Sequence, residues 1–241
     1  MANTTLEAKK VIIIGGTSGI GLAVAEAAAR EGARVVVASS QAANVEVAVK
    51  RLGGSASGSA IDVNNEEDLR RLFMDVGPVD HLVYSAGDWA RTGGGALADL
   101  DLAAAAKGFA VRFWGALAMV KHGYPQIAAG GSIVLTDGLY AHRPVKGGAV
   151  GSAMLGAIEH LTRALAVDLA PIRVNAVCPG LVLTERNKKV MSEDLMRRFT
   201  ASQPLPRAAD PEEVAQAYLY LMRGGYTTGQ VLIVDGGRTL V

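Results

Sequence analysis

The chain of 241 residues has little cysteine, few aromatic side chains and almost no excess of charge. Its single cysteine, Cys178, excludes a disulfide within the chain and fits a reducing compartment. Cys178 lies in the run Val-Asn-Ala-Val-Cys-Pro-Gly, so we expect a packed thiol, with a nucleophile as the alternative. The 24 basic and 23 acidic residues leave a net charge of +1. That balance favours neither nucleic acid nor an acidic membrane surface as a partner.

Long apolar runs are also scarce. Half of the residues are hydrophobic, yet no run approaches the roughly 18 residues of a membrane span. The first ten residues hold no long apolar segment and do not resemble a signal peptide. We therefore expect a cytoplasmic protein without membrane contact. The length fits one α/β domain over residues 1–241, large enough for a sizeable core.

Glycine, by contrast, is abundant at 29 residues, and its most informative positions lie within residues 11–21. Four β-branched residues at 11–14 predict a strand buried on both faces of a parallel sheet. The alanine-rich run from Leu22 to Arg30 predicts a helix. Between the two lie the glycines Gly15, Gly16, Gly19 and Gly21.

A strand, a glycine turn and a helix start, in that order, form an anion-binding site. Gly15 allows the tight turn, Gly19 lets the backbone approach a pyrophosphate, and Gly21 lets the helix pack closely on the strand. The helix N-terminus presents N–H groups and a partial positive charge to the phosphates. The alternative is a tight turn that binds no ligand.

The glycine spacing differs from the common G-x-G-x-x-G fingerprint of dinucleotide-binding proteins. It resembles the T-G-x-x-x-G-x-G motif of the short-chain dehydrogenase/reductase family, with Ile14 in place of the usual Thr. The resemblance covers residues 9–241. It implies a single Rossmann-type, doubly wound α/β domain with a seven-stranded parallel sheet flanked by helices.

The pattern along the chain predicts the remaining elements. His81 is expected at the surface, where its strand begins. A charged stretch at 183–206 is expected to be the substrate lid, and Pro211 opens the last helix. Further strands are expected at 34–38, 60–63, 81–84, 132–136, 172–177 and 229–237, and further helices at 45–52, 102–124 and 151–170.

The resemblance implies a nicotinamide dinucleotide at the glycine turn. Asp62 would hydrogen-bond the adenine ring, or its carboxylate would cap a helix that starts at Asn64 or Asn65. Ser85 replaces a family Asn whose amide ties the neighbouring strand in place. The expected cofactor-binding residues are Gly15, Thr17, Ser18, Gly19, Ile20, Gly21, Ser39, Ser40, Asp62, Val63, Ser85, Ala86, Gly87, Pro179, Gly180 and Thr184.

The choice between NADP and NAD depends on the residues after the second strand. An acid there would hydrogen-bond the ribose 2′-hydroxyl of NAD and repel the 2′-phosphate of NADP. This chain has the neutral residues Ser39, Ser40 and Gln41. Neutral hydroxyls can accept the phosphate, so we expect NADP, with NAD possible. The alternative is a plain polar loop.

The family's catalytic residues are missing at the matching positions. In the family a Tyr moves the proton, with help from a Lys, a Ser and an Asn. The Lys is needed because a phenol of pKa about 10 is otherwise a poor base. An alignment without gaps, anchored at 131–134 and 161–167, places Gly138 at the Ser position, Gly151 at the Tyr position, Leu155 at the Lys position and Arg112 at the Asn position.

Two replacements are possible. Tyr140 could transfer the proton with Lys146 lowering its pKa. Alternatively, Asp137 and Arg112, which flank the vacated positions, could form an acid–cation pair that polarises a substrate oxygen. The plainer alternatives are loop packing for Tyr140, solvated surface for His142 and Lys146, and an ordinary ion pair for Arg112.

Two functions remain open at this stage. The first is an NAD(P)-dependent oxidoreductase acting on a small carbonyl, alcohol or imine substrate through an atypical active site. The second is a non-redox protein that binds the dinucleotide as a scaffold, a sensor or a lyase-like enzyme. No metal is expected. The resemblance implies a homotetramer or homodimer built through the two long helices and the C-terminal strand region.

Overall fold

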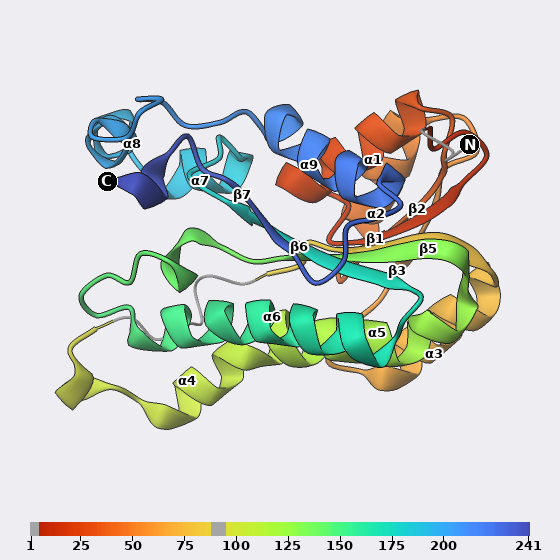
Figure 1. Cartoon of the computed structure of the whole chain (residues 1–241), viewed down its shortest axis with the longest axis horizontal. Helices are drawn as coiled ribbons and strands as arrows, with labels where there is room; N and C mark the ends of the chain where they lie inside the picture. The colour runs from red at the N-terminus through yellow and green to blue at the C-terminus, as the bar shows by residue number, and fades with distance from the viewer. Residues whose placement is uncertain (1–4, 88–94) are drawn as a thin grey trace.

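The computed structural model describes residues 5–87 and 95–241. These residues form a seven-stranded parallel sheet in the order β3-β2-β1-β4-β5-β6-β7, with helices on both faces (Figure 1). The doubly wound α/β fold expected from the sequence is confirmed. The strands are β1 (Lys10–Ile14), β2 (Arg34–Ser39), β3 (Ser57–Ala60), β4 (Val79–Tyr84), β5 (Ile127–Thr136), β6 (Arg173–Pro179) and β7 (Val231–Val234).

Two layers of helices cover the sheet (Figure 1). One face carries α1 (Gly19–Arg30), α2 (Ala42–Leu52) and α9 (Pro211–Arg223). The other face carries α3 (Glu66–Val76), α4 (Leu102–Phe109), α5 (Gly115–Gly123) and α6 (Ala149–Asp168). Two short helices, α7 (Glu185–Val190) and α8 (Glu193–Thr200), lie in the segment between β6 and α9.

The strand β1 shows how the sequence produces these layers. Its side chains alternate, so that Val11 and Ile13 join the core beneath α1 and α9, while Ile12 and Ile14 join the core beneath α3 and α5. All four side chains are buried. Burying each one contributes about 1.5–3 kcal/mol, which is why a central parallel strand is apolar at every position.

The segment after β3 differs from the expectation. The strand ends at Ala60, so Asp62 lies beyond it, and α3 begins at Glu66. The cap of α3 is Asn65, whose side chain accepts a hydrogen bond from the Glu67 amide at 3.1 Å. The Asp62 carboxylate instead holds the Asn64 amide at 2.9 Å. Asp62 therefore shapes the turn and leaves the helix cap to Asn65.

The expected helix over 102–124 is interrupted by a π-helical segment, η3 (Ala110–Trp114). A π turn moves backbone groups out of the regular helical pattern. The hydroxyl of Tyr84, at the end of β4, donates to the Val111 carbonyl inside this segment. This hydrogen bond fixes the segment to the sheet next to Arg112. Arg112 itself is buried, with 6% of the residue exposed.

The helical stretch Leu102–Gln126 also corrects the expectation about apolar length. It spans 25 residues, and an 18-residue window within it has a mean hydropathy of 1.2, which would suffice to cross a membrane by length and composition alone. In this fold Ala116, Met119 and Val120 are buried against the sheet. Packing on the sheet therefore accounts for part of the apolar character of this stretch, since 39% of its apolar 18-residue window is buried.

The expectation that His81 lies at the surface is wrong. His81 is 4% exposed, and its Nδ1 lies 2.9 Å from the Ser132 hydroxyl of β5. The reason is topological, since β4 is flanked by β1 and β5 and covered on both faces. Burial lowers the pKa of His81 to about 4.

This burial predicts a loss of stability in mild acid. Between pH 6.5 and about 4, His81 is protonated in the unfolded chain and neutral in the folded chain. The free energy of unfolding therefore falls as the pH falls. When the pH is lowered from 7 to 4.5, the midpoint temperature of thermal unfolding should fall by roughly 5 °C less for His81→Asn than for the wild type. The control His160→Asn, at an exposed position, should follow the wild type. Parallel curves for all three proteins would contradict this account.

Candidate functional site

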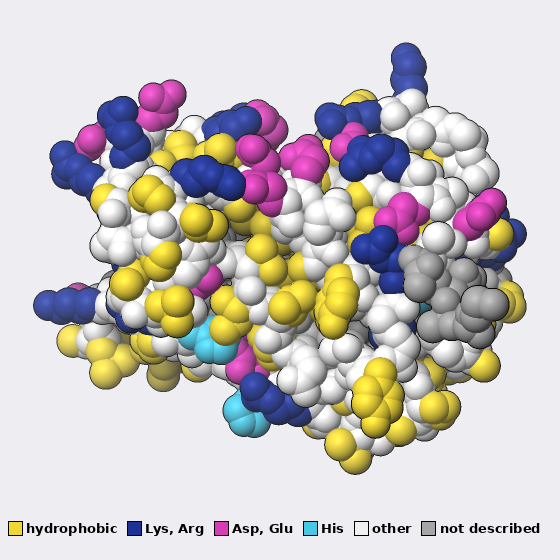
Figure 2. Space-filling view, turned by 45° about the horizontal axis from the view of Figure 1, so that its top comes forward, with side chains coloured by type: hydrophobic (Ala, Val, Ile, Leu, Met, Phe, Trp, Pro, Cys, Tyr) yellow, Lys and Arg dark blue, Asp and Glu magenta, His cyan; other side chains and the backbone are white. Residues whose placement is uncertain are grey.

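A cavity of about 1240 Å³ lies where the carboxyl ends of β1, β2, β4, β5 and β6 meet. This edge is where open α/β sheets bind their ligands. All sixteen residues expected to bind the cofactor line it, together with Arg112, Asp137, Gly138 and Tyr140. Figure 2 shows Lys and Arg side chains interspersed with Asp and Glu on one face of the molecule, in keeping with the net charge of +1.

The glycine turn has the geometry that the sequence predicts. Gly15 and Gly19 adopt φ angles of +87° and +52°, which only glycine reaches without strain. A Cβ on Gly15 would lie 2.5 Å from the Ala86 amide nitrogen, and a Cβ on Gly21 would overlap the Gly15 carbonyl. The backbone therefore forms the cavity wall itself.

The start of α1 is open to an anion. Its N-cap, Ser18, makes no side-chain cap hydrogen bond, and the first turn of this fully described helix holds no acidic residue. The free amide groups of that turn consequently face the cavity, and so does the positive end of the helix dipole. Both features fit the phosphates of a dinucleotide.

Further walls come from β4 and from the segment after β6. The Ser85 hydroxyl donates to the Ile14 carbonyl at 3.2 Å, so the serine restores a tie to the neighbouring strand that loss of the family Asn was expected to remove. Thr184 caps α7 by accepting from the Asn187 amide at 3.2 Å. The Thr184 methyl group lies 3.0 Å from the place that a Cβ on Gly19 would take. The expected lid region thus reaches the glycine turn.

Arg112 enters the cavity through space that Gly87 leaves free. A Cβ on residue 87 would overlap the Arg112 guanidinium, so glycine at this position is a condition for the arginine to lie there. Burial lowers the pKa of Arg112 to about 10, which still leaves the side chain cationic at neutral pH. The cavity thus holds the Arg112 cation, and the absence of a side chain at Gly87 leaves the space that the guanidinium occupies.

Asp137 directly follows β5 and is fully buried. Its amide donates to the Val177 carbonyl at 2.8 Å, which fixes the backbone between β5 and β6. Neither carboxyl oxygen has a hydrogen-bond donor among the described residues. Burial raises the pKa of Asp137 to about 8, and the Glu159 carboxyl adds to the rise. Asp137 is therefore a carboxylic acid at neutral pH.

The two expected replacements are placed differently. Arg112 and Asp137 both line the cavity, and Asp137 acts electrostatically on the Arg112 guanidinium. Tyr140 lines the cavity from the short helix Leu139–Ala141. Lys146 is exposed and lies outside the cavity lining. The structure therefore brings Asp137 and Arg112 to one cavity and separates Lys146 from Tyr140.

The remaining positions of the expected catalytic set lie on two elements. Gly138 lines the cavity just after β5. Gly151 and Leu155 are buried within α6 and do not line the cavity. No phenol or ammonium group enters the cavity from these two α6 positions.

One residue near the site, Glu159, escaped the sequence analysis. Glu159 of α6 is 8% exposed, and its Oε1 lies 2.7 Å from the His142 Nε2. A lone acid on an otherwise apolar helix face was the available signal. His142 was expected to be solvated surface, but it is paired with this acid. Cys178 is buried as expected, and burial raises the pKa of its thiol.

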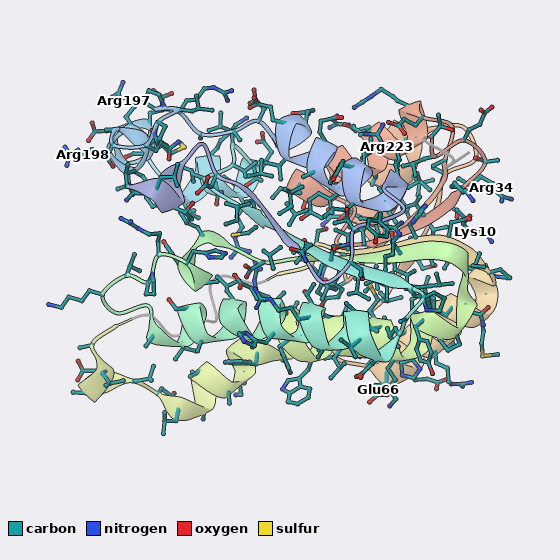
Figure 3. All side chains as sticks on the ribbon, in the orientation of Figure 1. Lys10, Arg34, Glu66, Arg197, Arg198 and Arg223 are labelled. Atoms are coloured by element: carbon teal, nitrogen blue, oxygen red, sulfur yellow. The ribbon has the colours of Figure 1, made fainter. Side chains whose placement is uncertain are left out.

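The lid stretch contributes several residues that sequence spacing could not place. From α7, α8 and the turn between them, Glu185, Arg186, Val190, Met191 and Phe199 line the cavity. The remaining charged residues of α8 do not share this orientation. Figure 3 shows the labelled Arg197 and Arg198 pointing outward, away from the sheet. The lining of this stretch thus combines polar side chains from the start of α7 with the apolar Val190, Met191 and Phe199.

Comparison with known proteins places the chain in a family. A family model described as enoyl-(acyl carrier protein) reductase matches residues 15–239. A short-chain dehydrogenase/reductase of Stachybotrys chlorohalonatus is 36% identical over 254 residues, which cover 98% of this chain and 99% of that protein.

Two solved structures agree with the fold. The MalC reductase/Diels-Alderase from Malbranchea aurantiaca has a TM-score of 0.92 and 30% identity and covers 100% of both chains. A small-chain dehydrogenase in complex with NADPH has a TM-score of 0.83 and 34% identity, covering 98% of this chain and 100% of that one. The sequence motif, the fold and these similarities together show that the chain belongs to the short-chain dehydrogenase/reductase family.

Proposed function

We propose that this protein is an NADP(H)-dependent oxidoreductase that acts on a small carbonyl, alcohol or imine substrate through a non-standard active site. The observation that carries the proposal is the meeting of two features in one cavity. These are the backbone cradle at residues 15–21 and the pair of Arg112 and protonated Asp137. The family's Ser, Tyr, Lys and Asn positions are held instead by Gly138, Gly151, Leu155 and Arg112.

The cradle residues fit the cofactor. The turn of Gly15 and Gly19 and the open start of α1 suit the pyrophosphate. Ser39 and Ser40 line the far end of the cavity and carry no negative charge that would repel a 2′-phosphate. The relative crystallised with NADPH supports the same choice. The nicotinamide supplies or accepts a hydride when bound.

Arg112 and Asp137 then handle the oxygen or nitrogen of the substrate. The Arg112 guanidinium donates hydrogen bonds and stabilises negative charge that develops there. Asp137, protonated at neutral pH, gives its proton to the same atom during reduction. Hydride transfer itself depends mainly on positioning, which the cavity walls and the lid at 183–206 provide.

Asp137 is favoured over Tyr140 as the proton donor. The Tyr140 hypothesis needs a neighbouring cation, and Lys146 is exposed outside the cavity. For Asp137, burial and the neighbouring Glu159 carboxyl together raise the pKa to about 8, so the group holds a proton to give at neutral pH. The two hypotheses are separated by single substitutions.

A second function is favoured by one relative. The name of the Malbranchea protein joins a reductase to a Diels-Alderase, which supports a non-redox use of a similar cavity. In this chain Arg112 would then polarise a substrate for bond formation while the dinucleotide stays unchanged. Product formation with no oxidation of NADPH would favour this second function.

We also propose a cytoplasmic homodimer or homotetramer. Phe109, Phe113 and Trp114 form an aromatic group with ring centroids 6.2 and 5.0 Å apart. Trp114 remains 60% exposed, so a large apolar side chain faces solvent. An interface between two copies of this chain at this helix would cover the Trp114 side chain.

The cofactor choice is tested by adding one charge. In Ser39→Asp, the new carboxylate should repel the 2′-phosphate and raise the dissociation constant of NADPH at least about tenfold, a cost of about 1.4 kcal/mol. The affinity for NADH should hold or improve. Calorimetric titration measures both, and Ser55→Asp, at an exposed position outside the cavity, adds the same charge as a control. Equal affinities in both variants would contradict the assignment of Ser39.

The proton donor is tested by following NADPH oxidation over a panel of carbonyl and imine substrates. Asp137→Asn and Arg112→Met should each lower the turnover rate about 10²–10³-fold with little change in NADPH affinity. Tyr140→Phe and Lys146→Ala should stay close to the wild type. The reduction rate of the wild type should fall as pH rises past about 8, because Asp137 then loses its proton. An inactive Tyr140→Phe beside an active Asp137→Asn would reverse the assignment.

A further inference from the structure

Glu159 has no role in the fold or in the proposed reaction as described so far. It lies on the face of α6 that packs toward the sheet, beside the buried residues Leu155, Ile158 and Thr162. Burying a carboxyl among such residues is costly unless it has partners. Its partners therefore indicate why this position holds an acid.

The first partner is Asp137. The carboxyl groups of Asp137 and Glu159 interact directly, and the interaction raises the pKa of Asp137 in addition to burial. Neither oxygen of Asp137 has a donor among the described residues. Two buried carboxyl groups in contact cannot both ionise, and the stable arrangement is a shared proton.

The second partner leads toward solvent. The His142 Nε2 lies 2.7 Å from the Glu159 Oε1, and the His142 side chain is 28% exposed. Arg163 approaches the other oxygen, Oε2, at 3.2 Å. Asp137 is fully buried, so these contacts form a continuous series from the cavity to the surface.

The groups facing this series come from every neighbouring element. The Cys178 thiol lies near Asp137. The Cys178 Sγ, one carboxyl oxygen of Asp137 and one ring nitrogen of His142 lie within 4.8 Å of one another. Burial keeps the thiol protonated. The other charged or titratable groups acting on these residues are Arg112, Tyr218, Asp235 and Arg163.

We propose that Glu159 and His142 carry protons between solvent and Asp137, so that each turnover restores the acid in the cavity. The proposal rests on the proposed oxidoreductase function. In reduction, the substrate carbon gains the hydride, and the Asp137 O–H bond breaks as its proton moves to the substrate oxygen or nitrogen. This leaves the pair of carboxyl groups without its shared proton. His142 then gives a proton to Glu159, Glu159 passes it on to Asp137, and water or buffer recharges His142. Oxidation runs every transfer in reverse.

Neither Glu159 nor His142 lines the cavity, so both act through Asp137. Histidine is suited to the outer end of such a path because its ring gains and loses protons near neutral pH. A path of this kind explains why a fully buried acid can serve in repeated turnovers without opening the cavity to water.

The shared proton can be tested without a substrate. Infrared spectra of the resting protein at pH 7 should contain a protonated carboxyl band that disappears in Asp137→Asn and shifts in Glu159→Gln. Glu67→Gln, at an exposed position, is the matched control and should leave the band unchanged. Absence of the band in the wild type would overturn the proposal. So would stoichiometric zinc in the purified protein that is lost in Cys178→Ser, because the cluster would then be a metal centre.

The path itself is tested by the difference between first and later turnovers. His142→Ala should complete one turnover at the wild-type rate and then slow at least about tenfold, and added imidazole should restore the later turnovers. Glu159→Gln should slow similarly without rescue, and His160→Ala should match the wild type. Later turnovers at full speed in both His142→Ala and Glu159→Gln would overturn the proposal.

The oxidoreductase function and the proton path are contradicted by different results. A wild type that oxidises no NADPH with any substrate would remove the oxidoreductase function, and the infrared band would then decide by itself whether the proton is shared. A wild type that turns over normally, with no effect of either substitution, would leave the oxidoreductase function standing and remove the path. Thermal unfolding of each variant shows whether it is folded.

Discussion

Contact between two carboxyl groups, buried without a hydrogen-bond donor on Asp137, is the interaction on which the proposed chemistry depends. A lone buried aspartate would lose much stability by ionising, and a shared proton removes that cost. The backbone at the end of β5 fixes Asp137 at this place through its hydrogen bond to Val177. The fold therefore places a protonated acid in the cavity at neutral pH, which is the group that the proposed reaction uses.

The cofactor side of the cavity follows a different principle, because it is made from backbone rather than from side chains. Gly15, Gly19 and Gly21 are required by positive φ angles or by close contacts. Gly87 has an equivalent role on the substrate side, where it leaves room for Arg112. Glycine thus decides both where phosphates can approach and where the cation can lie.

Local sequence patterns were sufficient for most of the fold. The β-branched run of β1, the glycine turn and Pro211 at the start of α9 are all encoded within a few residues. The pattern failed where distant elements decide. His81 is buried because β1 and β5 flank its strand. The π-helical segment is held by Tyr84, and the Asp137–Glu159 contact joins residues 22 positions apart. None of these contacts has a local signature.

The most direct test of the central claim is the fate of labelled hydride. The wild-type protein would be incubated with NADPH carrying deuterium at the transferable position and with the substrate panel, and the product mass would be measured. The account predicts one deuterium bonded to carbon in the product, with a matching amount of NADP⁺ formed. A product formed without deuterium, while the labelled NADPH stays intact, would contradict it and favour the non-redox function.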